Sequence, residues 1–288
     1  MAGRPPDDYA SRKAFKQNPG HTHFEGTRRP LTGKTQSTII NRVPQEPGLS
    51  DFGLQGITYV LGSGFPTNSV YLVTGDPGTF YATFAQQALY NACKQKIKVV
   101  YYTTEASSEE IIQDMHTFKW DIGDAMDDGS WVFTRVLPPQ LKTVASNTPE
   151  DPREHRIDLP PHSLSALRDD FIEMLNEGRW SALSLSYIMK TYPEDEVTDL
   201  IMYWVSAAHN IGGVHFILLP KGIHEESRIN YIKSLVDGVL SFKFAQGFEQ
   251  AEGEIDIEKL RRVIPKVKTI RHAVQDNGLA IETTARVG

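Results

Sequence analysis

The stretch Val70-Tyr-Leu-Val-Thr-Gly-Asp-Pro-Gly-Thr-Phe-Tyr-Ala-Thr83 decides the fold of this chain. Its first five residues are nearly all apolar, which is typical of a strand covered on both faces. After the Gly-Asp-Pro-Gly turn, apolar residues recur every four positions at Phe80, Phe84, Ala88 and Ala92, which predicts a helix with one apolar stripe. The stretch therefore predicts a strand, a glycine-rich turn and a helix in direct succession.

This order has the shape of a phosphate loop, in which backbone N–H groups at a helix N-terminus face a phosphate. A working loop also needs a lysine for the β- and γ-phosphates and a hydroxyl for Mg²⁺, in the order Gly-Lys-Ser/Thr. The three matching positions here are Phe80, Tyr81 and Ala82, and Thr83 comes one residue late. The candidate phosphate-binding residues of this altered loop are Gly75, Asp76, Pro77, Gly78, Thr79, Phe80, Tyr81, Ala82 and Thr83.

The rest of the chain alternates between strand and helix patterns, which favours an α/β fold with a mostly parallel central sheet, flanking helices and antiparallel strands at the C-terminal end. Ser107-x-x-Glu110 predicts a capping box, and Asn277-Gly278 predicts a hairpin turn. We expect an irregular insertion at about 138–163. Further strands are expected at 98–104, 131–137, 180–188, 213–219, 239–244, 266–270 and 279–283. Further helices are expected at 164–175, 194–210 and 227–236.

Charge is distributed unevenly along the 288 residues, whose formal net charge is −6. Residues 1–50 carry eight Lys/Arg against four Asp/Glu and lack periodicity, so we expect an extended or disordered basic arm followed by a single domain at 51–288. A second basic segment, 259–272, contains no acid. The overall pI of 5.9 argues against a dedicated nucleic-acid binder. With no bilayer-length apolar run, no signal peptide and one cysteine, we expect a cytoplasmic protein.

The segment from Leu61-Gly-Ser-Gly64-Phe-Pro66 to Gly75-Asp-Pro-Gly78-Thr resembles the opening of the KaiC-like ATPases of the RecA superfamily. Those proteins typically read Gly-Gly-x-Pro-x-Gly-Ser, an apolar strand, and Gly-x-Pro-Gly-Thr-Gly-Lys-Thr. Further matches follow in order at Phe84-Ala85-x-Gln87, Tyr101-Tyr-Thr-Thr-Glu105 and Val236-Asp237-Gly238-Val239. The resemblance covers roughly residues 52–285 and implies a RecA-like fold.

The same resemblance implies a role for Glu105 and indicates that other functional residues of the family have no counterpart here. Glu105 occupies the position of the family's catalytic glutamate, here interpreted as a candidate or vestigial base. The strand that should end in a metal-holding aspartate, Ser181–Tyr187, offers only serines. The family's Lys-x-Arg strand, which reaches a neighbouring subunit's nucleotide, is met only loosely by Lys266-Val-Lys268 and Arg271.

Three hypotheses follow. In the first, the chain is a pseudo-ATPase with weak or no hydrolysis, acting as a regulatory or scaffold subunit of a homo- or hetero-oligomer, for which a ring is one arrangement. In the second, it is a divergent ATPase in which Lys94, Lys221 or a neighbour's cation replaces the missing lysine. In the third, the basic arm binds nucleic acid or an anionic protein partner.

We expect no resident cofactor beyond ATP or ADP bound with weak affinity. We also expect no metal site, because no helical His-x-x-x-His pair occurs. The resemblance to single-domain KaiC-like proteins favours an archaeal source.

Overall fold

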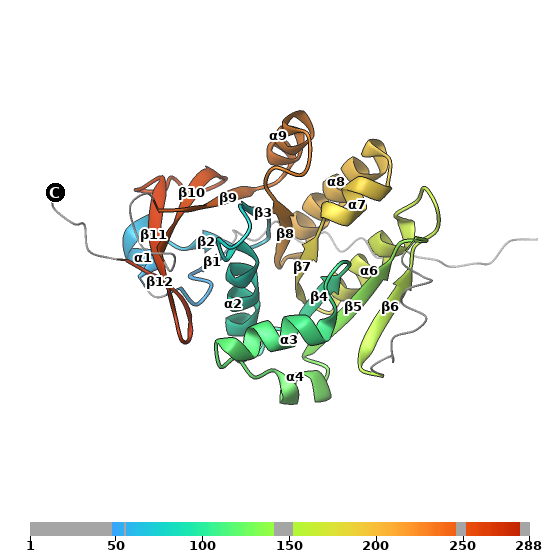
Figure 1. Ribbon diagram of the computed structural model, residues 1–288, viewed down its shortest axis with the longest axis horizontal. Coiled ribbons are helices and arrows are strands. Elements are labelled where there is room, and N and C mark those ends of the chain that lie inside the picture. The colour runs from blue at the N-terminus through green and yellow to red at the C-terminus, as the bar shows by residue number, and fades with distance from the viewer. Residues whose placement is uncertain (1–47, 55, 141–151, 246–251, 283–288) are drawn as a thin grey trace, which may run out of the picture. The chain divides into compact units, whose positions relative to one another are not determined.

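The computed structural model of the chain describes residues 48–54, 56–140, 152–245 and 252–282. Helices lie on both faces of a large sheet (Figure 1). The strands are β1 (Leu49–Ser50), β2 (Phe65–Pro66), β3 (Ser69–Gly75), β4 (Val99–Thr103), β5 (Trp131–Leu137), β6 (Glu154–Asp158), β7 (Trp180–Ser184), β8 (Val214–Pro220), β9 (Gly238–Phe244), β10 (Glu252–Leu260), β11 (Thr269–Gln275) and β12 (Gly278–Ile281). The helices are α1 (Ile57–Leu61), α2 (Tyr81–Lys94), α3 (Ser108–Thr117), α4 (Gly123–Asp127), α6 (Ser165–Asn176), α7 (Ser186–Thr191), α8 (Glu194–Ile211) and α9 (Glu226–Leu235).

Within the described residues, ten strands form the large sheet in the order β12-β11-β10-β9-β3-β8-β7-β4-β5-β6. Neighbours from β9 to β6 are parallel, whereas β10, β11 and β12 each run antiparallel to the strands beside them. The predicted fold class is confirmed, including the antiparallel strands at the C-terminal end. Every residue of β3 is buried because β8, β9 and helices surround it.

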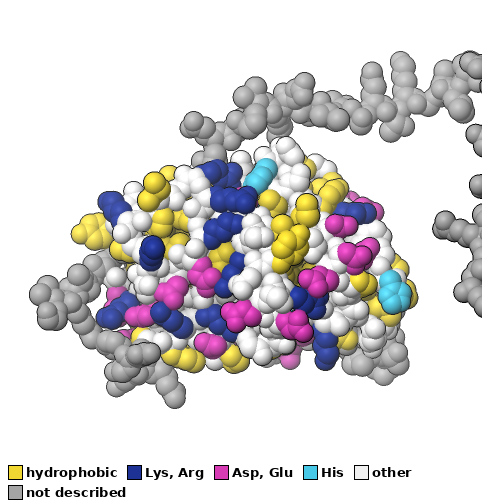
Figure 2. Space-filling view, turned by 90° about the horizontal axis from the view of Figure 1, so that it is seen from above, with side chains coloured by type: hydrophobic (Ala, Val, Ile, Leu, Met, Phe, Trp, Pro, Cys, Tyr) yellow, Lys and Arg dark blue, Asp and Glu magenta, His cyan; other side chains and the backbone are white. Residues whose placement is uncertain are grey.

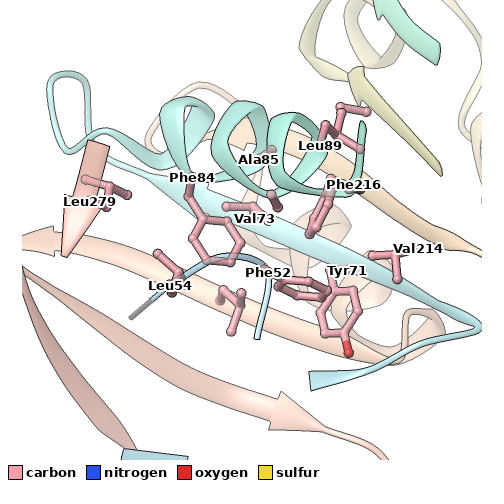
Figure 3. Packing of buried hydrophobic residues seen from close by; sticks show 14 of the residues in the cluster. Phe52, Leu54, Tyr71, Val73, Phe84, Ala85, Leu89, Val214, Phe216 and Leu279 are labelled. Atoms are coloured by element: carbon pink, nitrogen blue, oxygen red, sulfur yellow. The ribbon is translucent and has the colours of Figure 1, made fainter. Parts of the chain in front are cut away.

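One face of the sheet is covered mainly by α2. Its apolar stripe places Phe84, Ala85 and Leu89 against Val73 and Phe216 of the sheet (Figure 3). The segment after β1 completes this core, and the rings of Phe52 and Phe65 stack with centroids 4.7 Å apart. The fourfold periodicity in the sequence therefore predicts the buried face of α2 correctly.

The other face is covered by α6, α7, α8 and α9. Here Trp204 of α8 stacks on Phe171 of α6 with ring centroids 4.0 Å apart. His215 of β8 is fully buried beneath them, and its Nδ1 accepts a hydrogen bond from the Ser181 hydroxyl at 2.8 Å. No helix of the described residues has both the length and the apolar character needed to cross a bilayer.

The structure differs from the sequence-based expectation in several places. The strand expected at 266–270 is β11, which begins only at Thr269 and runs to Gln275. The insertion at 138–163 contains β6, an edge strand whose exposed, charged residues hide the strand pattern. The expected strand at 180–188 ends at Ser184 and continues as α7. A strand that we did not predict, β10, alternates Gly, Ile and Ile on its buried side with acids on the other. The predicted arm 1–50 falls outside the described residues up to position 47, and its last two residues form β1.

Two local predictions are confirmed. The Ser107 hydroxyl accepts a hydrogen bond from the N–H of Glu110, whose carboxylate accepts one from the N–H of Ser107. β11 and β12 form the expected hairpin. Gly278 is required there by both backbone and space, since its φ is +118° and a Cβ would meet Trp120 and Gln87.

A buried carboxylate joins four parts of the fold. Asp237, 2% exposed, precedes β9, and its carboxylate accepts a hydrogen bond from the Val70 N–H of β3 at 3.1 Å. His209 Nε2 of α8 lies 2.9 Å from the same carboxylate. The guanidinium groups of Arg261 and Arg262, which follow β10, are each 3.6 Å away. Removing this charge would leave two arginines facing an uncompensated site.

We therefore expect Asp237→Asn to lower the free energy of unfolding by about 3 kcal/mol, because it breaks a buried ionic cluster while keeping the side chain's size. Urea denaturation followed by circular dichroism measures this change. The control is Asp256→Asn, which removes a partly exposed ion pair with Lys243 and should cost less than about 1 kcal/mol. Equal losses in the two variants would contradict a special role for Asp237.

Two buried histidines make stability depend on pH. Burial lowers the pKa of both His215 and His272 to about 4. The unfolded chain binds these protons near pH 6.5 and the folded chain only near pH 4. The contribution of each neutral ring to the free energy of unfolding is therefore fully present above pH 6.5. It is lost as the pH falls from 6.5 toward 4, by up to about 3 kcal/mol.

His272 tests this cleanly because neither ring nitrogen has a hydrogen-bond partner among the described residues. In His272→Leu, the loss of unfolding free energy between pH 7 and pH 5 should be smaller than in the wild type. Denaturant titrations at several pH values measure it, with the exposed His116→Gln as control. Parallel pH profiles for wild type and His272→Leu would refute the assignment.

Candidate functional site

The glycine-rich loop lies between the carboxyl end of β3 and the first turn of α2. Gly75 has no room for a side chain, because a Cβ there would lie 2.5 Å from Thr79 Oγ1 and 2.9 Å from Phe242 Cβ. Thr79 closes the turn by donating both its N–H and its hydroxyl to the Asp76 carbonyl, at 3.1 and 2.6 Å. Gly78 adopts a φ of +85°. The loop is therefore a tight, internally hydrogen-bonded turn.

Phe80 has the backbone conformation of a glycine. Its φ of +61° and ψ of +23° lie in the left-handed region, which costs a residue with a side chain about 1–2 kcal/mol. It stands where the resemblance places a glycine. Phe80 thus holds a left-handed backbone conformation that glycine would adopt without cost.

The first turn of α2 carries aromatic and apolar side chains in place of a cation. Phe80, Tyr81 and Ala82 are all half-buried and pack against the core of this face. Burial and the negative charge of Glu105 raise the pKa of Tyr81, so this phenol stays neutral. No side chain caps the N-terminus of α2. The site keeps the helix dipole but has no lysine at the expected place.

Lys94 and Lys221, the two lysines considered as replacements for the phosphate-loop lysine, lie in very different parts of the structure. Lys94 ends α2, about 20 Å along the helix axis from Tyr81, and its ammonium lies over the Tyr90 ring. That position rules Lys94 out as a ligand of this loop. Lys221 follows β8, donates its N–H to the Gly75 carbonyl at 3.0 Å and donates its ammonium to the Phe242 carbonyl at 3.2 Å.

The strand register shows where the Lys221 side chain runs. Pro220 on β8 and Phe242 on β9 are both register partners of Gly75, on opposite sides of β3. The Lys221 side chain therefore crosses the end of β3 at the base of the loop. Of the two lysines, Lys221 is therefore the one that lies at the loop.

Glu105 lies just beyond β4 at the same edge of the sheet. Its Oε2 accepts hydrogen bonds from the hydroxyls of Ser184, at the end of β7, and of Thr104, at 2.8 and 3.1 Å. The carboxylate is exposed. Because the carboxyl ends of parallel strands share one edge, Glu105 lies at the same edge as the loop, with β8 and β7 between β4 and β3, and its charge acts on Tyr81.

A serine and a histidine that sequence reasoning missed adjoin this edge. The Ser186 hydroxyl lies 2.8 Å from His224 Nε2, and Ser186 is 8% exposed. Burial and the charge of Arg228 lower the pKa of His224, while Glu105 acts in the opposite direction. The two residues are 38 positions apart, so no spacing in the sequence could have revealed the pair.

Two hydroxyls near the loop are directed at protein acceptors, whereas the buried hydroxyl of Thr74, just before the loop, has no hydrogen-bond partner among the described residues. Thr79 donates to the Asp76 carbonyl, and Ser184 donates to Glu105. Among the described residues, no group of three His, Cys, Asp or Glu side chains is arranged to hold a metal ion. The side chains present do not fit a Mg²⁺-triphosphate, although the backbone path does.

The parallel sheet, the strand-loop-helix path at Gly75–Phe80 and Glu105 at the next strand end define a domain of the RecA superfamily of phosphate-loop ATPases. A family model described as "ATPase: KaiC" matches residues 51–286. The chain belongs to the KaiC ATPase family.

Relatives of this chain come from archaea and bacteria. A UPF0273 protein of Pyrococcus furiosus is 31% identical over 44% of this chain and 47% of its own length. A UPF0273 protein of Pyrococcus horikoshii is 26% identical over the same shares. The circadian clock oscillator protein KaiC of Rippkaea orientalis is 22% identical over 72% of this chain and 39% of its own. The chain thus matches about half the length or less of these relatives.

The strained backbone at Phe80 is testable with two substitutions that remove the same ring. We expect Phe80→Gly to be more stable than Phe80→Ala by about 1 kcal/mol, because only glycine accepts a left-handed φ without cost. Denaturant unfolding of both variants measures the difference. At Tyr90, inside α2, the sign should reverse, with Tyr90→Ala more stable than Tyr90→Gly. The same order at both positions would show that Phe80 is not held as described.

Proposed function

We propose that this KaiC-family domain has lost efficient ATP hydrolysis and acts as a regulatory or scaffold subunit of an oligomeric assembly. The observation that carries the proposal is the first turn of α2, where Phe80, Tyr81 and Ala82 replace the glycine, lysine and hydroxyl of a working loop. A lysine on a polyphosphate forms charge-assisted hydrogen bonds worth about 1.5–3 kcal/mol each, so its absence severely weakens triphosphate binding.

The surroundings of the loop support the same conclusion. Phe80 and Tyr81 present half-buried rings at the turn where phosphate oxygens would need donors. Glu105 is engaged by two hydroxyls, and the nearby strand end offers Ser184 where a metal-binding carboxylate would be needed. ATP or ADP, if bound, is held by backbone N–H groups and the helix dipole alone, and so weakly.

Restoring the loop tests this proposal. In isothermal titration calorimetry with Mg-ATP, the wild type should show weak or no binding. The triple variant Phe80→Gly, Tyr81→Lys, Ala82→Thr should bind at least about tenfold more tightly, because it regains one charge-assisted ligand. Tyr90→Lys is the control, since it adds a lysine to α2 away from the loop. Tight binding by the wild type would overturn the proposal.

A second candidate function is a divergent ATPase that uses Lys221 as the cation and Glu105 as the base. The course of the Lys221 side chain across the end of β3 favours it. In that case the wild type would hydrolyse ATP, and Glu105→Ala and Lys221→Ala would each abolish turnover. Lys94→Ala, at the far end of α2, would leave turnover unchanged.

The remaining parts of the proposal concern partners and source. We propose that the chain assembles with copies of itself or with relatives, that a ring is one such arrangement, and that the basic arm contacts a protein partner. Residues 1–47 of the arm lie outside the described residues. The structure therefore does not test whether the arm contacts nucleic acid. A cytoplasmic location and an archaeal source remain predictions, and the relatives include both archaeal and bacterial proteins.

A further inference from the structure

A cavity of about 330 Å³ lies between α2, the end of α3 and the turn that joins β11 to β12, elements that Figure 1 shows beside one another. This volume is within the range of small-molecule sites in proteins. By contrast, the face of the molecule in Figure 2 mixes Lys and Arg side chains with Asp and Glu, so charge alone indicates no ligand there. The cavity also lies about 20 Å along β11 from Lys268, so it is separate from the loop between β10 and β11.

One face of α2 forms the floor of this cavity. The residues that line it follow the i, i+3, i+4 and i+7 spacing of a single helical stripe, and they are Gln87, Tyr90, Asn91 and Lys94. The Gln87 side chain is 4% exposed, donates to the Leu279 carbonyl at 3.0 Å and accepts from the Leu279 N–H at 2.7 Å. These two hydrogen bonds hold β12 against α2 and so fix the floor of the cavity relative to its wall.

Aromatic rings form a second wall. The rings of Phe118 and Trp120 stack with centroids 4.9 Å apart, and Trp120 stacks on Tyr90 with centroids 5.7 Å apart. The Trp120 Nε1–H donates to the Asn277 carbonyl at 3.1 Å, which fixes the orientation of the indole. Phe118 and Trp120 are buried, whereas Tyr90 is half-buried and continues the stack outward. A planar apolar group that enters the cavity therefore meets a preformed aromatic surface.

The charges beside the cavity match a single negative charge. Two lysines line it: Lys94, whose Nζ lies 5.4 Å from the centroid of the Tyr90 ring, and Lys119. The Lys119 ammonium lies 3.1 Å from the Asp276 carboxylate, which offsets its charge. The carboxyl ends of α2 and α3 also point toward this region and carry negative partial charge. The excess positive charge is therefore no more than that of Lys94, which suits a monoanion.

We propose that this cavity binds a small aromatic monocarboxylate. The ring of the ligand packs against the stack of Tyr90 and Trp120, and its carboxylate accepts a hydrogen bond from the Lys94 ammonium. The ammonium leaves the Tyr90 ring to make this contact, because an exposed cation–π contact is weaker than a charge-assisted hydrogen bond. The exposed amides of Gln275 and Asn277 at the rim supply hydrogen bonds to polar substituents on the ligand.

Other small molecules fit the same cavity less well. A nucleotide brings two or more negative charges to a place where Asp276 already offsets one of the two lysines. An aliphatic carboxylate leaves the aromatic stack without a partner. A wholly apolar ligand makes no use of Lys94 or of the amides at the rim, which are the groups that give such a site its specificity.

An NMR titration of the full chain with 3-phenylpropanoate tests the proposal. We expect a saturable shift of the Trp120 indole N–H signal, which is assigned by comparison with Trp120→Phe. Two analogues separate the contributions of the ligand: 3-phenylpropanamide lacks the charge, and propanoate lacks the ring. Each should bind at least about tenfold more weakly than 3-phenylpropanoate.

Two substitutions at the cavity should weaken this binding. Lys94→Gln removes the ammonium and should lower the affinity about tenfold, whereas Tyr90→Leu removes the ring and should lower it about three- to tenfold. Lys96→Gln is the matched control, since Lys96 is an exposed lysine two residues further on that does not line the cavity. Because Lys94 is exposed, Lys94→Gln should keep the wild-type melting temperature, so the test stands even if Tyr90→Leu is destabilised.

Three results would rule this site out: no saturable shift at millimolar ligand, equal affinity for 3-phenylpropanoate and its amide, or equal affinity of Lys94→Gln and Lys96→Gln. ATP, added in place of the carboxylate, should leave the Trp120 signal unshifted because of its several negative charges. The outcome is independent of the proposed loss of ATP hydrolysis, because the glycine-rich loop lies at the other end of α2.

Discussion

The burial of β3 at the centre of the sheet is the constraint on which the rest of this structure depends. Every residue of the strand is buried, so its backbone must be hydrogen-bonded and its ends must be fixed by the protein itself. At its start, the Val70 N–H and carbonyl both bond to Asp237. At its end, the Gly75 carbonyl accepts from Lys221. These hydrogen bonds fix the two ends of β3, one at the amino edge and one at the carboxyl edge of the parallel strands.

At the carboxyl edge, the fixed end of β3 helps to set the path of the loop. Gly75 is confined between Thr79 and Phe242, and the rings of Phe80 and Tyr81 pack against the core. The free energy gained from burying these two rings compensates for the cost of holding Phe80 in the left-handed backbone region. The glycine-rich turn therefore keeps its shape with Phe80, Tyr81 and Ala82 in the positions that follow it, because sterics and core packing hold it.

At the opposite edge, the Asp237 cluster holds two of the six Lys and Arg side chains of the basic segment 259–272. Arg261 and Arg262 lie close to this buried carboxylate, and Lys259 caps the end of α9. Lys266 and Lys268 are exposed and form neither an ion pair nor a side-chain hydrogen bond with the described residues. A run of cations that looks like a single binding surface in the sequence is thus divided into an anchoring part and an exposed part.

The sequence by itself determined the fold class, the buried face of α2, the Ser107 cap and the replacement of the loop's lysine, since these follow from periodicity and local spacing. It could not predict β6 or β10, because edge position and cross-strand pairing stabilise those strands more than their own composition does. Only the tertiary structure could separate Lys221 from Lys94 or bring Ser186 to His224, because strand register alone decides which distant residues meet at one edge of the sheet.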